Sequence, residues 1–93
     1  MIKKNIGRVH WLLWHLSPDF KKAYSLYFDY AFHNYTFCRY SGRKLYDCFI
    51  VVQTSRHYWQ VMYCNTFTHR YVHFGYRNTR IIAQKMMEIY AEG

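Results

Sequence analysis

The sequence has few residues that break or cross-link a chain, and few acidic side chains. Its 93 residues include one proline, four glycines, three cysteines and five aspartates or glutamates. Three cysteines without Cys-x-x-Cys spacing do not suggest a disulfide framework, so we expect reduced thiols in a cytoplasmic protein. The five acids are scattered and leave no carboxylate cluster for Mg²⁺. No glycine-rich phosphate loop is present. We therefore expect no cofactor.

Long apolar runs are also absent, which argues against a membrane partner. Lys3 and Lys4 precede an apolar stretch in the manner of a signal peptide. His10, Trp11, Trp14 and His15 interrupt that stretch, however, and no cleavage site of small residues follows. The sequence thus predicts neither a bilayer-spanning segment nor a secretory leader.

Positive charge and aromatic rings are abundant instead. Thirteen Lys and Arg give a net charge of +8, which favours polyanionic partners by long-range attraction and counterion release. Charged residues make up only 19% of the chain, so we expect residues 1–93 to fold as one small domain. Eleven tyrosines exceed what a small core can satisfy, because each buried hydroxyl needs a partner. Some of these rings must lie at a surface or an interface.

The first sixteen residues predict a helix that is apolar almost all round. One stripe recurs at steps of three or four residues and consists of Ile2, Ile6, Val9, Leu13 and Leu16. Trp11 and Trp14 fall on the other side. A helix with two apolar faces is either sandwiched in the fold or offers one face to a partner. We expect the two tryptophans to form an interface with a host protein or with a second copy of the chain.

A second helix is expected to begin at Ser17-Pro18-Asp19 and to run to about Asn34. Ser17 suits the N-cap, Pro18 the first helical position, and Asp19 the positive end of the helix dipole. The predicted buried face consists of Phe20, Tyr24, Tyr27 and Ala31.

From Tyr35 the apolar period changes to two, which is typical of strands. We expect four, over Tyr35–Tyr40, Leu45–Gln53, Tyr58–Cys64 and Arg70–Gly75, and a last helix from Asn78 or Thr79 to about Ala91. The Leu45–Gln53 segment is apolar on both faces and should be central. The predicted fold is α+β, with two N-terminal helices, a three- to four-stranded antiparallel sheet, and a C-terminal helix packed on one face.

The stretch Tyr35–Arg80 carries the candidate binding site. It holds seven of the thirteen Lys and Arg against one carboxylate, Asp47. Loop cations and a helix start can hold phosphates, while exposed rings stack unpaired bases, a mixture that suits single-stranded or looped RNA more than DNA. A plainer alternative is that charged residues simply belong at turns. The candidate nucleic-acid-binding residues are Arg39, Arg43, Lys44, Arg56, Tyr58, Arg70, Tyr71, His73, Arg77 and Arg80.

The order of elements resembles two families in outline. One is the double-stranded-RNA-binding domain, although the paired lysines that open its last helix and its Gly-Pro-His loop are missing here. The other is the RelE-type ribonuclease toxin, which uses Arg, Lys, Tyr or His around the scissile phosphate. That second resemblance implies Arg56, Tyr63, His73 and Arg80 as catalytic candidates, although no motif characteristic of the family is present.

A metal site is the remaining chemical candidate. Cys64, His69 and His73, with Cys38 or Cys48, have a spacing that resembles zinc ligands. His69 and His73 lie four residues apart in a predicted strand, however, about 13 Å at 3.3 Å per residue, which is too far for one ion. We therefore expect no metal.

The sequence as a whole favours a non-catalytic RNA-binding protein. In size and basicity it resembles phage early proteins that block a host factor or a defence system. A protein-binding inhibitor that occupies a nucleic-acid channel of its target, and a small RelE-like ribonuclease, are the two alternatives.

Overall fold

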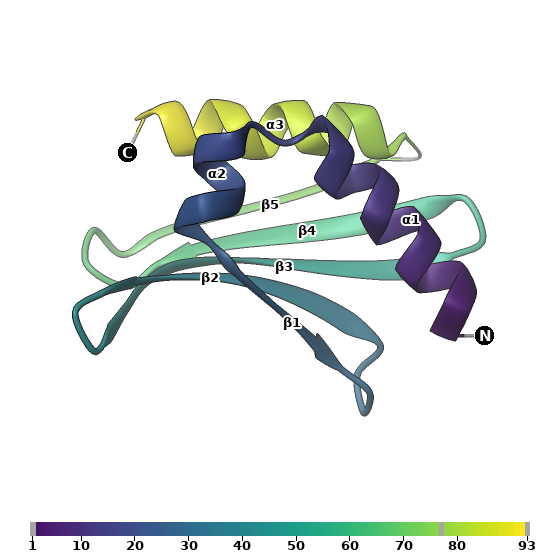
Figure 1. The fold of residues 1–93 in the computed structure, drawn as a ribbon, viewed down its shortest axis with the longest axis horizontal. Helices are drawn as coiled ribbons and strands as arrows, with labels where there is room; N and C mark the ends of the chain where they lie inside the picture. Colours follow the sequence, from purple (N-terminus) through teal and green to yellow (C-terminus); the bar gives the residue numbers. More distant parts are fainter. Residues whose placement is uncertain (1, 77, 93) are drawn as a thin grey trace.

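The computed structural model describes the backbone of residues 2–76 and 78–92 and the side chains of residues 9–75 and 78–92. Two short helices precede five strands and a final helix (Figure 1). The elements are α1 (Ile2–His15), α2 (Pro18–Ala23), β1 (Ser25–Asp29), β2 (Asn34–Ser41), β3 (Lys44–Ser55), β4 (Tyr58–Asn65), β5 (Arg70–Tyr76) and α3 (Thr79–Glu92).

The five strands form one antiparallel sheet in the order β1-β2-β3-β4-β5. Every strand pairs with its neighbour in the sequence, so turns alternate between the two ends of the sheet. All three helices lie on the same face of the sheet, and the opposite face is bare (Figure 1). We call these the covered face and the open face.

Helix α1 follows its predicted apolar stripe only in part, because Leu13 is half-buried and Leu12, which the predicted stripe did not include, is buried instead. Val9, Leu12 and Leu16 are buried, whereas Trp11 and Trp14 keep 57% and 76% of their surfaces exposed. This exposure leaves both indoles accessible, and the interface expected at Trp11 and Trp14 stays a prediction. The side chains of Ile2 and Ile6 lie outside the described residues.

Helix α2 begins as predicted but is much shorter. The Ser17 hydroxyl accepts a hydrogen bond from the Phe20 amide at 3.1 Å, and Pro18 opens the helix. The chain turns extended at Tyr24, and residues 25–29 form β1 rather than more helix. The predicted helix to Asn34 is wrong because the alternation of Ser25 to Asp29 pairs with β2, and this tertiary pairing overrides helix propensity.

The sheet therefore has five strands, not three or four. The four predicted strands are confirmed with small shifts of their ends, and β3 is central, as its two apolar faces indicated. The β2–β3 turn contains Gly42 with a φ of 63°, a left-handed conformation that glycine adopts without steric cost.

The core lies between the covered face and the helices. From the sheet it takes Phe37, Phe49, Val51, Trp59 and Val61, all with 2% or less of their surfaces exposed. Against these pack Phe20 of α2 and a stripe of α3 consisting of Ile82, Ala83, Met86 and Ile89. The α3 cap is also as predicted, since the Asn78 side-chain oxygen accepts a hydrogen bond from the Arg80 amide at 2.8 Å.

Across residues 2–76 and 78–92, no helix has the length and apolar character that crossing a bilayer requires.

Candidate nucleic-acid interface

The open face is defined by the strand register, because directly paired residues of an antiparallel sheet share a face. Three rows of residues run across all five strands there. The outer row consists of Asp29, Asn34, Val52, Gln60 and Gly75 and carries a single carboxylate, and two further rows lie beside it. One of these two rows consists of Tyr27, Thr36, Ile50, Met62 and His73, and the next consists of Ser25, Cys38, Cys48, Cys64 and Tyr71. Neither of these two rows contains a Lys, Arg, Asp or Glu. The middle of the open face is thus aromatic, aliphatic and thiol-bearing, with one imidazole.

Several rings stand out from this face. Tyr71 keeps 67% of its surface exposed, Tyr27 53% and Tyr40 48%. His73 is also exposed. A methyl group built on Gly75 would collide with the Tyr58 ring, so that ring lies directly over the glycine. Of the predicted stacking residues, Tyr58, Tyr71 and His73 therefore share the open side of β4 and β5.

The predicted loop cations lie at the two ends of the sheet. At one end Arg43 belongs to the β2–β3 turn and Lys44 is the first residue of β3, and at the other end Arg56 belongs to the β3–β4 turn (Figure 1). The twelve residues of β3 separate these turns by roughly 35–40 Å at 3.3 Å per residue. The middle of the open face is therefore an aromatic strip without Lys, Arg, Asp or Glu, with Asp29 beside it and a cationic turn at each end of the sheet.

The three cysteines are neighbours on this face and are free thiols. Burial, followed by the adjacent Cys64 and Cys38, raises the pKa of Cys48 to about 12. Burial likewise raises the pKa of Cys38, partly offset by a hydrogen bond with Tyr40. Because a thiolate is the nucleophile and the metal ligand, the raised pKa values of Cys38 and Cys48 make these two thiols poorly suited to either role at neutral pH. All three lie in the same row of the open face as Tyr71.

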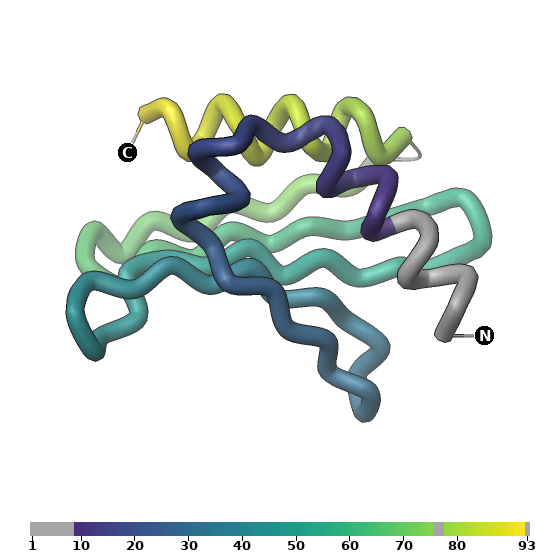
Figure 2. Tube along the Cα trace, viewed as in Figure 1, coloured from purple at the N-terminus to yellow at the C-terminus, as the bar shows by residue number. Residues whose placement is uncertain are grey.

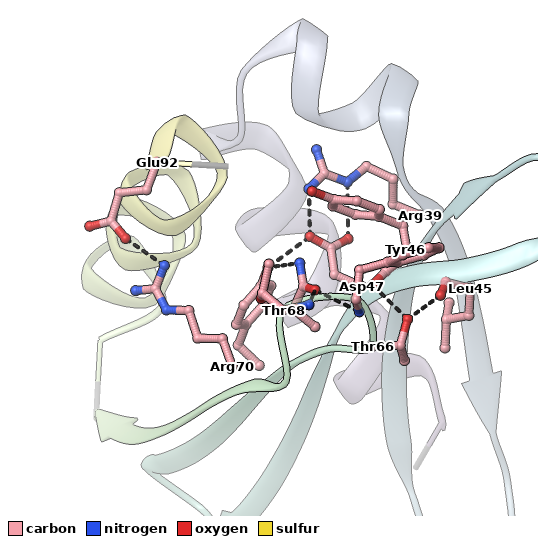
Figure 3. A network of polar contacts seen from close by, with 11 residues as sticks. Arg39, Leu45, Tyr46, Asp47, Thr66, Thr68, Arg70 and Glu92 are labelled. Carbon is pink, nitrogen blue, oxygen red and sulfur yellow. Dashed lines mark hydrogen bonds and ion pairs between the residues drawn. The ribbon is translucent and has the colours of Figure 1, made fainter.

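Arg39 lies on the covered face. Its Nε donates to Asp47 Oδ1 at 3.0 Å and its Nη2 to Asp47 Oδ2 at 2.6 Å (Figure 3). The guanidinium carbon also sits 4.6 Å from the Tyr46 ring centroid, 5.1 Å from that of Tyr90 and 5.2 Å from that of Tyr24. Burial opposes the charge of Arg39, but its contacts with Asp47 and Tyr24 outweigh burial and raise its pKa.

Asp47 anchors a buried network around this pair. It has no exposed surface and also accepts a hydrogen bond from the Tyr63 hydroxyl at 2.9 Å. Asn65 donates to the same hydroxyl at 3.2 Å and accepts from the amides of Phe67 and Thr68. Burial, with a contribution from Asp47, raises the pKa of Tyr63. A network with its polar groups satisfied in this way fixes the β2–β3 and β4–β5 ends of the sheet.

Arg70 is placed on the covered side as well. Its Nη1 lies 2.6 Å from Glu92 of α3, and its guanidinium carbon is 5.8 Å from the Tyr63 ring centroid (Figure 3). Two of the predicted phosphate contacts, Arg39 and Arg70, are thus paired with carboxylates rather than gathered beside the open rings.

Arg80 lies with the tryptophans of α1. A groove of about 450 Å³ is lined by His10, Trp11, Trp14, His15 and Arg80. This groove belongs to the helix layer and not to the open face. Arg77, the last predicted binding residue, lies outside the described residues.

The candidates for catalysis and metal binding do not come together. Tyr63 is 3% exposed on the covered face, whereas His73 points to the open face, and Arg56 belongs to a turn. This set cannot surround one phosphate. His69 has a φ of 55° in the β4–β5 turn, before His73 in β5. Among the described residues, no three His, Cys, Asp or Glu side chains are grouped so that they could hold a metal ion.

Tyr27 is the residue of the open face that the sequence interpretation placed wrongly. Its spacing from Phe20 and Tyr24 suggested the buried side of a helix. A second signal was present, since Ser25, Tyr27 and Asp29 alternate with the apolar Leu26 and Phe28. Reading that alternation as a strand would have added a fifth strand and placed Tyr27 on the open face.

Comparison with models of protein families, with curated proteins and with solved structures finds no significant match to this chain. Its function must therefore be inferred from its own residues.

Proposed function

We propose that this protein binds single-stranded RNA on the open face of its sheet, without catalysis. One observation carries the proposal: Tyr27, Tyr40 and Tyr71 are exposed on a bare sheet face whose two ends bear the cationic turns of Arg43–Lys44 and Arg56. Single-stranded nucleic acid needs flat rings for its bases and cations for its phosphates.

In this proposal the strip between the turns stacks bases. Tyr71 and His73 of β5 and Tyr58 of β4 offer neighbouring rings, and Tyr27 and Tyr40 extend the surface toward β1 and β2. The absence of fixed charge from the two central rows suits stacking, which tolerates any base. Arg43, Lys44 and Arg56 then hold the backbone where the strand leaves the sheet. Arg39 and Arg70 take no part, because their guanidinium groups face Asp47 and Glu92.

The test is a salt titration of binding to a labelled single-stranded RNA, with DNA of the same sequence beside it. Each neutralised phosphate on a single strand contributes about −0.7 to the slope of log K against log salt. Arg43→Ala/Lys44→Ala should therefore make the slope less steep by about 1.4. The matched control is Lys21→Ala/Lys22→Ala, which removes the same charge from exposed residues of α2 on the covered side.

A less steep salt slope in the Arg43/Lys44 variant but not in the Lys21/Lys22 variant supports the proposal. Stronger binding of RNA than of DNA supports the choice of RNA. Equal changes in both variants would mean non-specific attraction to the whole cationic protein, and the open face would lose its role. Absence of binding at low salt would reject the function.

Protein binding is the second candidate, and the exposed indoles of Trp11 and Trp14 favour it. In that function the chain inhibits a host or defence protein, with α1 seated on the target. An apolar interface of this kind should persist at salt concentrations that release RNA. Trp14→Ala should weaken it and leave RNA affinity unchanged. We place either function in the cytoplasm, where Cys38, Cys48 and Cys64 remain reduced.

A further inference from the structure

The two edges of the sheet differ in what lies beside them. At the β5 edge, Arg70 is paired with Glu92 of the adjacent α3. Charged side chains and covering helices are devices that keep an edge strand from pairing with another chain. The β1 edge pairs with β2 on one side only. Its sequence from Ser25 to Asp29 contains no Lys, Arg or Pro, and its only charge is at its last residue.

The β1–β2 hairpin is also unusually apolar at its surface. Leu26 keeps 40% of its surface exposed, Tyr27 53%, Tyr30 66% and Phe32 71%. In Figure 2 the hairpin, drawn in blue, projects beyond the other strands. It is ordered by its own contacts, since Asp29 Oδ1 accepts from the Ala31 amide at 2.9 Å and the Phe28 ring packs edge-on against Tyr30 at 4.5 Å. Exposed rings on a structured edge indicate an interface.

The distribution of positive charge indicates which kind of partner can pair with the β1 edge. No Lys or Arg occurs between Lys22 and Arg39, so the hairpin is the largest cation-free part of a chain with a net charge of +8. A polyanion is attracted elsewhere. Two copies of the chain, which repel each other in general, meet with the least repulsion at this hairpin.

We propose that two copies of this chain pair through β1, antiparallel and about a two-fold axis at Tyr27. The pairing is self-complementary, because each strand supplies the backbone donors and acceptors that the other lacks. In this register Leu26 of each copy lies opposite Phe28 of its partner on the covered side. A groove of about 270 Å³, lined by Leu26, Phe28, Tyr35 and residues of α1, adjoins that pair and has room for a side chain of the partner copy.

The dimer has a ten-stranded sheet, and the two-fold axis keeps both open faces on the same side. The interface is small: burying much of the exposed surface of Leu26, Tyr27, Tyr30 and Phe32 in both copies removes on the order of 800 Å² in total, which is below the roughly 1,200 Å² of stable specific complexes and within the range of weak ones. We therefore expect a reversible dimer that forms at micromolar concentrations. This inference does not depend on RNA binding, because it concerns the edge of the sheet in the free protein.

The test is the mass of the full chain in sedimentation equilibrium between about 1 and 200 μM. The wild type should rise from 11.6 kDa toward twice that mass. Tyr27→Lys places two like charges face to face at the axis and should stay monomeric. Tyr71→Lys makes the same change on the open face of the other edge strand, β5, and should dimerise like the wild type.

A wild type that stays monomeric, or a Tyr27→Lys variant that dimerises equally well, would overturn the proposal; Trp14→Lys then tests the α1 face instead. If Tyr27→Lys does not fold, as judged by circular dichroism, cross-linking decides. In Tyr27→Cys the two new thiols face each other within disulfide reach, and oxidised glutathione can accept their two electrons and two protons. A covalent dimer in Tyr27→Cys, but not in Tyr71→Cys or the wild type, supports the β1 interface, and its absence rejects it.

Discussion

On the covered face of the sheet, Asp47 has no exposed surface and is held by Arg39 and Tyr63, whereas on the open face Tyr71 keeps 67% of its surface exposed. The same strands make both faces. Arg70 and Tyr71 are adjacent, yet one is paired with α3 and the other is open to a ligand. Alternation along a strand thus divides the polar chemistry of this protein into a part that stabilises the fold and a part that is free to bind.

The largest expected effect is on the covered face. Asp47→Asn leaves the mostly buried Arg39 guanidinium without its counter-charge, so the free energy of unfolding should fall by about 3–5 kcal/mol. Urea unfolding followed by tryptophan fluorescence measures this loss. RNA affinity of the folded fraction should not change. A loss below about 1 kcal/mol would mean that water already solvates Arg39.

On the open face the expected effect is on binding instead. Tyr71→Ala should weaken RNA binding by about 1–3 kcal/mol, roughly 5- to 150-fold, because a base loses its stacking partner. Its stability should stay within about 0.5 kcal/mol of the wild type. Tyr63→Phe is the converse control, since it removes a hydroxyl bonded to Asp47 and should lower stability without altering affinity. Unchanged RNA affinity in Tyr71→Ala would mean that Tyr71 is not part of the RNA-binding site.

The stability of the protein at alkaline pH tests the environment of the Cys48 thiol. Burial raises the pKa of Cys48 to about 12, while an unfolded cysteine titrates near 8.5. The protonated thiol therefore stabilises the fold fully below about pH 8.5, and this contribution is lost as pH rises toward 12. Melting temperature should fall from pH 8 to 10, and less steeply in Cys48→Ala. If the melting temperatures of the wild type and of Cys48→Ala fall in parallel with pH, groups other than Cys48 cause the fall.

A smaller effect is expected where Tyr58 of β4 meets Gly75 of β5. Gly75→Ala should cost about 1 kcal/mol, because its methyl group displaces the Tyr58 ring. The same substitution in a Tyr58→Ala background should cost almost nothing, and a double-mutant cycle in urea measures the coupling. If the losses of stability from Gly75→Ala and Tyr58→Ala simply add, the new methyl group does not act through the Tyr58 ring.

The smallest effect should come from the exposed pair between Arg70 and Glu92, whose side chains are 41% and 58% exposed. Glu92→Gln should lower stability by no more than about 0.5 kcal/mol, and the difference should vanish in high salt. A loss as large as that of Asp47→Asn would erase the distinction between buried and exposed ion pairs in this sheet.

Local patterns were sufficient for most of the elements. The period of two marked Tyr58–Cys64 and Arg70–Gly75 as strands, and the caps at Ser17 and Asn78 marked the starts of α2 and α3. The pattern failed at residues 25–29, where helical spacing of aromatic residues and strand alternation coincide. Residues 25–29 form a strand because they can pair with the edge of β2, and this pairing depends on tertiary structure.

The candidate site was harder to predict. Charge counting grouped Arg39 and Arg70 with the turn cations, because a sequence does not show which carboxylate will lie beside a guanidinium. Asp47 is eight residues from Arg39, and Glu92 is far from Arg70 along the chain.

Local patterns in the sequence were enough to predict a small basic α+β chain with two tryptophans opposite the apolar stripe of its first helix, because periodicity, caps and composition act over a few residues. The tertiary structure decided the number of strands, the partners of Arg39 and Arg70, and the bare edge at β1. Each of these depends on contacts between residues distant in the chain, and their free energies appear only when the sheet and helices pack together.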